Sequence, residues 1–128
     1  MVLLGDSYER GLLEFALNPE TVRAAHDRAL AVGLLQDEYY IRPGQDAVLW
    51  GTDFSYNSGP MISPEMFREF CLPNIKKRVE AVHRRGLKAL KHACGNNTPL
   101  LDTYQLIESL QPVNRLRRDY GLDIRHAM

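Results

Sequence analysis

The chain has 128 residues, with 16 basic and 16 acidic side chains and a formal net charge of zero at pH 7. This length predicts one domain, or part of one, that is long enough to bury a core. The balanced charge gives no attraction for polyanions, and the basic residues lack interleaved aromatic residues, which excludes a nucleic-acid partner. No apolar run reaches membrane-spanning length, so no membrane association is expected.

The cysteines and the N-terminal residues predict a cytoplasmic protein. Two cysteines, Cys71 and Cys94, do not make a disulfide framework, and they fit a reducing compartment. Residues 1–6 become charged too soon to act as a signal peptide.

The first predicted helix begins at Asn18, where a side-chain cap is followed by Pro19 and an acidic residue in the first turn. Apolar residues at helical spacing continue through Leu30. His26 lies on this stripe, and we interpret it as a packed helix histidine rather than a ligand.

The first predicted strand follows a Pro-Gly break. Asp46–Trp50 is a short apolar run of the kind that forms a buried strand. Residues 51–60 then form a polar, glycine-bearing loop. A loop that follows a strand of an α/β barrel is where substrate contacts are expected.

A second helix is predicted from Ser63 to about Val82, with a cap followed by proline and then apolar spacings of three and four. Pro73 should kink it, and Gly86 suits the position just past its end. Cys71 lies on the apolar stripe and is interpreted as a small buried thiol.

The next strand, Leu87–His92, ends in the most informative motif of the chain. Strand side chains alternate between faces, so His92 and Cys94 should lie on the same face, as half of a zinc site. A sharp turn at residues 95–97 follows, and Thr98 is predicted to cap another helix, with Pro99 in its first position.

The last part of the chain gives weaker signals. Leu100 to Glu108 is predicted to be helical, and Ser109–Gln111 is predicted to form a brief strand. Asn114 to Tyr120 is predicted to be helical again, and His126 is predicted to be solvated. The alternation of elements predicts an α/β fold in which Asp46–Trp50 and Leu87–His92 are parallel neighbours.

Ordered motifs across most of the chain resemble the uroporphyrinogen decarboxylase family, in the wide sense that includes cobalamin-dependent methyltransferases. The resemblance implies a TIM (β/α)8 barrel with a deep site at the C-terminal ends of its strands. The motifs are Leu17–Glu20, Asp46–Val48, Asp53-Phe54, Asn57–Pro60, Ile62–Phe70, Leu72-Pro73, His92–Asn96 and Leu100-Leu101.

The resemblance also implies the chemistry. In the methyltransferase branch, a His-x-Cys pair and a later cysteine bind a zinc ion that holds an acceptor thiolate. That thiolate takes a methyl group from a corrinoid carried by a partner protein. His92 and Cys94 match the pair. The metal-free decarboxylases instead carry a serine shortly after the Asp-Phe motif, and Tyr56 stands there when the alignment is shifted by one residue. The motif match and the missing serine favour the methyltransferase-like branch.

Two features depart from the family pattern. A complete barrel takes roughly 200 residues or more, so this chain is expected to form a partial barrel of roughly three βα units. No cysteine follows Cys94, so the later zinc ligand is missing. Two ligands should hold zinc weakly unless Asp53, a thiol ligand or a neighbouring chain completes the shell. Unpaired strand edges would favour a homo-oligomer.

Three functions therefore remain open. The first is a zinc- and corrinoid-dependent methyltransferase, with Asp53, Asn57 and Tyr56 as the catalytic or substrate-contacting residues and Asp53 facing His92. The second is a metal-free lyase of the decarboxylase type acting on a small molecule, with His92 as a polar contact or acid. The third is a non-catalytic barrel fragment that self-associates.

Overall fold

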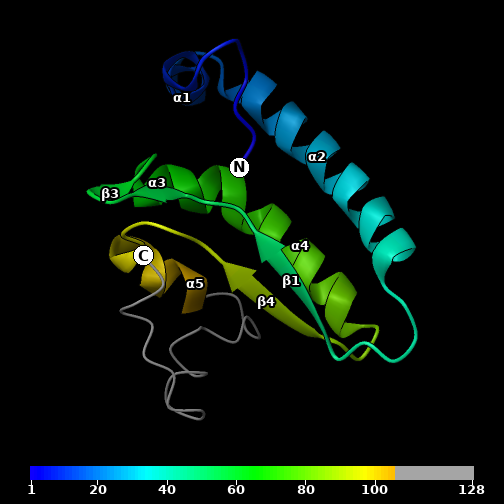
Figure 1. Cartoon of the computed structure of the whole chain (residues 1–128). Coiled ribbons are helices and arrows are strands. Elements are labelled where there is room, and N and C mark those ends of the chain that lie inside the picture. The colour runs from blue at the N-terminus through cyan, green and yellow to red at the C-terminus, as the bar shows by residue number, and fades with distance from the viewer. Residues whose placement is uncertain (106–128) are drawn as a thin grey trace.

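The structure, a computed structural model, describes residues 1–105 as helices layered on a pair of parallel strands. Helix α2 packs on α4, and α4 packs in turn on β4, so α4 lies between α2 and the strands (Figure 1). The elements, in chain order, are α1 (Tyr8–Leu17), α2 (Pro19–Tyr40), β1 (Ala47–Gly51), β2 (Ser55–Tyr56), β3 (Gly59–Pro60), α3 (Pro64–Met66), the π-helical segment η1 (Phe67–Cys71), α4 (Leu72–His83), β4 (Lys88–His92), the 3-10 turn η2 (Thr98–Leu100) and α5 (Leu101–Gln105).

Strands β1 and β4 are parallel neighbours, as the sequence predicts, and their register runs from Ala47 opposite Lys88 to Gly51 opposite His92. The helical run from α3 to α4 connects them, and η2 and α5 follow β4. Each strand is therefore followed by a helix, which is the repeating unit of a (β/α)8 barrel. Both strands end at the same edge of the sheet, which brings the loops after them together.

The two faces of this strand pair differ. Val48 and Ala89 lie opposite each other in the register and belong to the packed core or its margin. Leu49 and its partner Leu90 therefore point to the other face, because strand side chains alternate, and Leu49 is 65% exposed. By the same alternation, His92 shares the face of Leu49.

Helices α1 and α2 meet at Asn18, and only the second was predicted. Ser7 caps α1 by accepting a 3.2 Å hydrogen bond from the Arg10 amide. Gly11, which disfavours helix, interrupts the apolar pattern of α1 in the sequence. The predicted side-chain cap at Asn18 is wrong. Its side chain makes no capping bond to α2, and its amide instead donates to the Glu14 carboxylate, because α1 ends there.

The predicted cap at Ser63 is confirmed, since its hydroxyl accepts a 3.1 Å hydrogen bond from the Met66 amide. The irregularity predicted at Pro73 lies in η1, whose π-helical turns immediately precede α4 and its first-turn proline. Past the end of α4, Gly86 has the positive φ of 75° that its predicted position requires.

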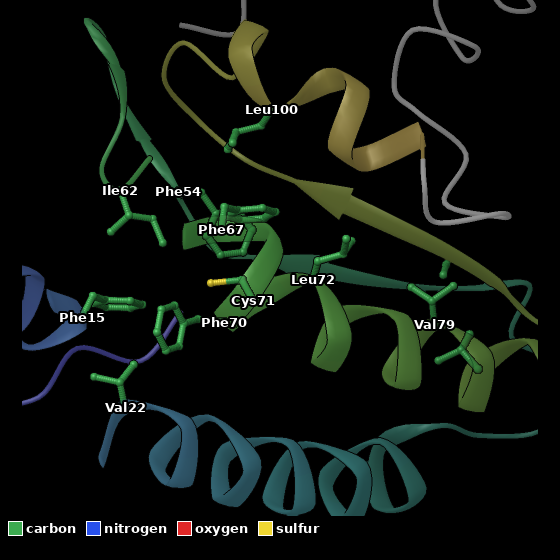
Figure 2. Packing of buried hydrophobic residues seen from close by; sticks show 12 residues of the cluster. Phe15, Val22, Phe54, Ile62, Phe67, Phe70, Cys71, Leu72, Val79 and Leu100 are labelled. Atoms are coloured by element: carbon green, nitrogen blue, oxygen red, sulfur yellow. The ribbon is translucent and has the colours of Figure 1, made fainter. Parts of the chain in front are cut away.

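The core lies where α1, α2 and η1 meet and continues along α4 (Figure 2). Phe15 and Phe70 make an edge-to-face contact with centroids 5.2 Å apart, and the Cys71 sulfur lies among these rings. Burial raises the pKa of Cys71 to about 11, which confirms a small buried thiol. His26 is also buried and bonds the Val22 carbonyl at 2.8 Å, which confirms a packed helix histidine.

The expected loop after β1 contains a short hairpin. Residues 51–60 were predicted to be a polar loop, but β2 and β3 pair antiparallel, with Ser55 opposite Pro60 and Tyr56 opposite Gly59. The two-residue connection between them, Asn57-Ser58, has a composition that favours turns. Each strand is only two residues long, so the turn residues dominate the local pattern and the sequence indicates a loop.

The chain after β4 follows the prediction with a shift of one residue. Asn97, not Thr98, is the cap residue, because η2 already includes Thr98 and Pro99 lies in its first turn. The predicted strand 109–111, the helix 114–120, the end of the helix predicted to reach Glu108, and His126 lie outside the described residues. No helix within residues 1–105 is long and apolar enough to cross a membrane.

Candidate metal centre

Three side chains with metal-ligating atoms meet where β1 and β4 end. One ligand atom from each of Asp53, His92 and Cys94 lies within 4.8 Å of the others, and all three residues are exposed. Nε2 of His92 lies 3.2 Å from Sγ of Cys94. The predicted same-face placement of His92 and Cys94 is thus confirmed, as is the expectation that Asp53 faces His92.

A backbone bond fixes Asp53 against the second strand-end loop. The Cys94 amide donates a 2.8 Å hydrogen bond to Oδ1 of Asp53. An ionised carboxylate has about four lone-pair directions, so this bond leaves acceptor capacity for a cation. Asp53 therefore holds the Cys94 loop in place while its carboxylate remains beside the thiol and the imidazole.

Lys91 lies beneath this cluster on the helix-covered side of β4. Its ammonium donates to the carbonyls of Thr52 and His92 and lies 4.7 Å from the centroid of the Phe54 ring. Burial lowers the pKa of Lys91 to about 8, although the negative charges of Asp53 and Cys94 partly oppose this shift. The site thus has a buried ammonium group beneath its three ligating side chains.

The hairpin is fastened to the loop that carries Cys94. The Asn96 amide donates to the Tyr56 carbonyl at 2.8 Å, and the Ser55 hydroxyl donates to the side-chain oxygen of Asn97 at 2.9 Å. The amide group of Asn97 then donates to the carbonyls of the loop itself, among them that of Cys94 at 2.9 Å. These bonds hold both the backbone of Cys94 and the hairpin in one position.

The two remaining predicted site residues lie on the hairpin rather than in the cluster. Tyr56 contacts the Cys94 loop through its backbone carbonyl, and its side chain is partly exposed. Asn57 lies in the exposed turn between β2 and β3. The structure therefore places the backbone of Tyr56 beside the loop that carries Cys94. Within the described residues, no hydrogen bond joins the side chain of Tyr56 or Asn57 to the three ligand residues.

Sequence reasoning missed Lys91 and Asn97. A lysine two residues after Ala89, on the buried face of a strand, is a recognisable signal, because charged residues are almost never buried without partners. Asn97 gave only the general signal of a turn residue, since the carbonyls it would bind cannot be read from the sequence.

The donor types and one measured separation in this cluster are compatible with a bound metal ion such as zinc. Metal–ligand bonds of 2.0–2.3 Å in a tetrahedron separate ligands by roughly 3.5 Å, close to the observed distance between Nε2 and Sγ. Imidazole, thiolate and carboxylate are all zinc ligands, and three protein ligands with solvent access match a site that keeps one open position. Asp53 is thus a candidate for the third ligand, in place of the later cysteine that this sequence does not have.

The comparisons with known proteins agree with this architecture. A family model described as Uroporphyrinogen decarboxylase (URO-D) matches residues 4–125. Neither the curated proteins nor the solved structures gave a significant match. The family fold is a TIM barrel, and the parallel strands with their following helices are part of one. Because the match spans nearly the whole chain, this protein belongs to the uroporphyrinogen decarboxylase family.

Proposed function

We propose that Asp53, His92 and Cys94 bind one zinc ion, and that the protein acts in methyl transfer to a thiol. The observation that carries this proposal is the meeting of three different ligand types at the ends of two parallel strands. In a barrel this edge is the catalytic one. The match of His92 and Cys94 to the family's zinc-binding pair supports the methyltransferase-like branch.

Bound there, zinc would lower the pKa of a coordinated acceptor thiol and present it as a thiolate without redox chemistry. The protein residues have separate tasks. His92 and Cys94 supply a neutral nitrogen and an anionic sulfur as ligands. Asp53 supplies an oxygen and, through the Cys94 amide, keeps the thiol loop in place. Exposure of all three leaves room for the acceptor at the open position.

The methyl donor in this proposal is a corrinoid presented by a partner protein, and the hairpin residues Tyr56 and Asn57 are proposed to contact the small-molecule acceptor. Self-association is proposed as well. Within residues 1–105, β1 and β4 pair only with each other, and Leu49 on their open face is 65% exposed. Unpaired edges and an apolar face both favour contact with another copy. Light scattering would give the mass.

The catalytic test uses protein stripped with a chelator and reloaded with one equivalent of zinc. Methylcobalamin and 2-mercaptoethanol are added, and thioether formation is followed with the loss of the methylcobalamin spectrum. We expect activity in the wild type and in Cys71→Ala, and at least a hundredfold loss in Cys94→Ser and His92→Gln. Activity that survives in Cys94→Ser would contradict the proposal.

A metal-free lyase is the second candidate, because His92 and the carboxylate of Asp53 would also serve as polar contacts or acids for a carboxylated substrate. Uroporphyrinogen serves as the probe. Decarboxylation that proceeds in the presence of a chelator would support this candidate. If neither assay gives activity while light scattering shows a stable oligomer, the non-catalytic reading is favoured.

A further inference from the structure

The Lys91 side chain bridges the C-terminal ends of β1 and β4 on the helix-covered face of the sheet. Its ammonium donates to the carbonyl of Thr52, one residue before Asp53, and to the carbonyl of His92. The Thr52 amide also donates to the His92 carbonyl, at 3.4 Å. One side chain thus bonds the backbone at both positions from which the metal-ligating loops leave the sheet.

Burial and contact with an aromatic ring hold the Lys91 side chain in this position. The residue is only 9% exposed, and its ammonium lies over the Phe54 ring, whose own side chain is buried in the core. An ammonium group has three donors. Lys91 uses two of them, one on the carbonyl of Thr52 just after β1 and one on the carbonyl of His92 at the end of β4. Since a buried ammonium is costly without partners, the position of Lys91 is tied to the position of both carbonyls.

We propose that Lys91 is a positioning residue for the candidate metal centre, which it serves by holding Asp53 and Cys94 at bonding distance. The expected effect of Lys91 on metal binding rests on the proposed zinc function, whereas the contacts of Lys91 with the two carbonyls do not depend on it. Without the ammonium, nothing but the weak 3.4 Å backbone bond joins Thr52 to His92 in the described residues. The loops then separate, and the bond between the Cys94 amide and Asp53 weakens.

The test compares Lys91→Met with Lys88→Met, because Lys88 lies on the same strand but is exposed. Methionine keeps the length of the side chain over Phe54 and removes the donors. Two quantities are measured, namely amide hydrogen exchange at Cys94 and the dissociation constant for Co²⁺ as a zinc probe. In Lys91→Met, we expect Cys94 exchange at least tenfold faster and roughly tenfold to hundredfold weaker Co²⁺ binding.

Local effects must be separated from loss of stability. Exchange at the Val82 amide in α4 should not change in Lys91→Met, Lys88→Met should match the wild type, and Lys91→Arg should recover part of both properties. The proposal is overturned if Lys91→Met keeps wild-type exchange at Cys94. It is equally overturned if protection is lost throughout the protein and Lys91→Arg recovers nothing. A wild type that fails to bind Co²⁺ contradicts the zinc function instead, while exchange at Cys94 still decides the role of Lys91.

Discussion

Gly95 packs directly against the backbone of Ser55. A Cβ atom on Gly95 would overlap the Ser55 carbonyl and would lie 2.8 Å from the Tyr56 carbonyl oxygen. Gly95 also has a φ of 80°, which side chains rarely tolerate. The hairpin can therefore approach the loop that carries Cys94 only because residue 95 is a glycine, which has no side chain.

Gly95→Ala should destabilise the protein by roughly 2–4 kcal/mol, because backbone strain and steric overlap add. The matched control is Gly86→Ala, where φ is 75° but nothing lies within 4 Å of an added Cβ. Gly86→Ala should lower the free energy of unfolding by only about 1 kcal/mol, because the cost comes from the positive φ alone. Denaturant unfolding of both variants measures the difference. Equal costs would show that the hairpin does not pack on Gly95.

Asp37→Asn should destabilise the packing of α2 on α4. The Asp37 carboxylate accepts two bonds from Arg78, at 2.6 and 2.7 Å, and Arg78 lies over the Trp50 ring. The variant leaves a partly buried guanidinium without its counter-charge, at a cost of about 1–3 kcal/mol.

The control for this effect is Glu65→Gln, which removes an exposed ion pair with Arg68 and should cost less than about 1 kcal/mol. Thermal or denaturant unfolding compares the two. A loss in Asp37→Asn no larger than that in Glu65→Gln would show that the pair does not hold the helices together.

The two thiols should differ sharply in reactivity. Cys94 is exposed, whereas Cys71 is buried and its pKa is raised to about 11. At pH 8 roughly one in a thousand Cys71 side chains would be a thiolate, so modification by a disulfide reagent should stop after one thiol. Cys94→Ser should show no fast-reacting thiol, and added zinc should slow the reaction of the wild type. Two thiols reacting at similar rates in native protein would contradict the structure.

Stability should fall as the pH drops from 7 towards 5.5. Burial lowers the pKa of His26, and Nε2 of its ring accepts a 3.2 Å bond from the Val2 amide, which requires the neutral form. The unfolded chain therefore binds protons more readily. The contribution of His26 to the free energy of unfolding is present above the unfolded pKa of about 6.5. It is lost as the pH falls through the lower pKa that His26 has in the folded protein.

His26→Gln should flatten this part of the stability profile, which denaturant unfolding at each pH would measure. His83→Gln is the control, because it removes a histidine from a different helix, at the end of α4. If the slope persists in His26→Gln, another group is responsible.

The sequence predicted the parts of this structure that depend on local pattern. The parallel pairing of β1 with β4 followed from helix starts and apolar runs, and the same-face placement of His92 and Cys94 followed from strand alternation. The bond between Asp53 and the Cys94 amide could not be derived, because it depends on how two loops 41 residues apart are placed. The bond from Lys91 to the Thr52 carbonyl likewise joins residues 39 positions apart and cannot be read from a local pattern. The Asn18 interaction with Glu14 is local, but it depends on α1, the helix that was not predicted.

The most direct test of the central claim is a Co²⁺ titration followed by absorption spectroscopy, because a cobalt–thiolate bond gives a charge-transfer band. Wild type and Cys71→Ala should bind one equivalent and show this band. Asp53→Asn should bind more weakly with the band retained, and Cys94→Ser should lack the band. If the wild type shows no band, or if Cys94→Ser shows the same band as the wild type, Asp53, His92 and Cys94 do not form the metal centre.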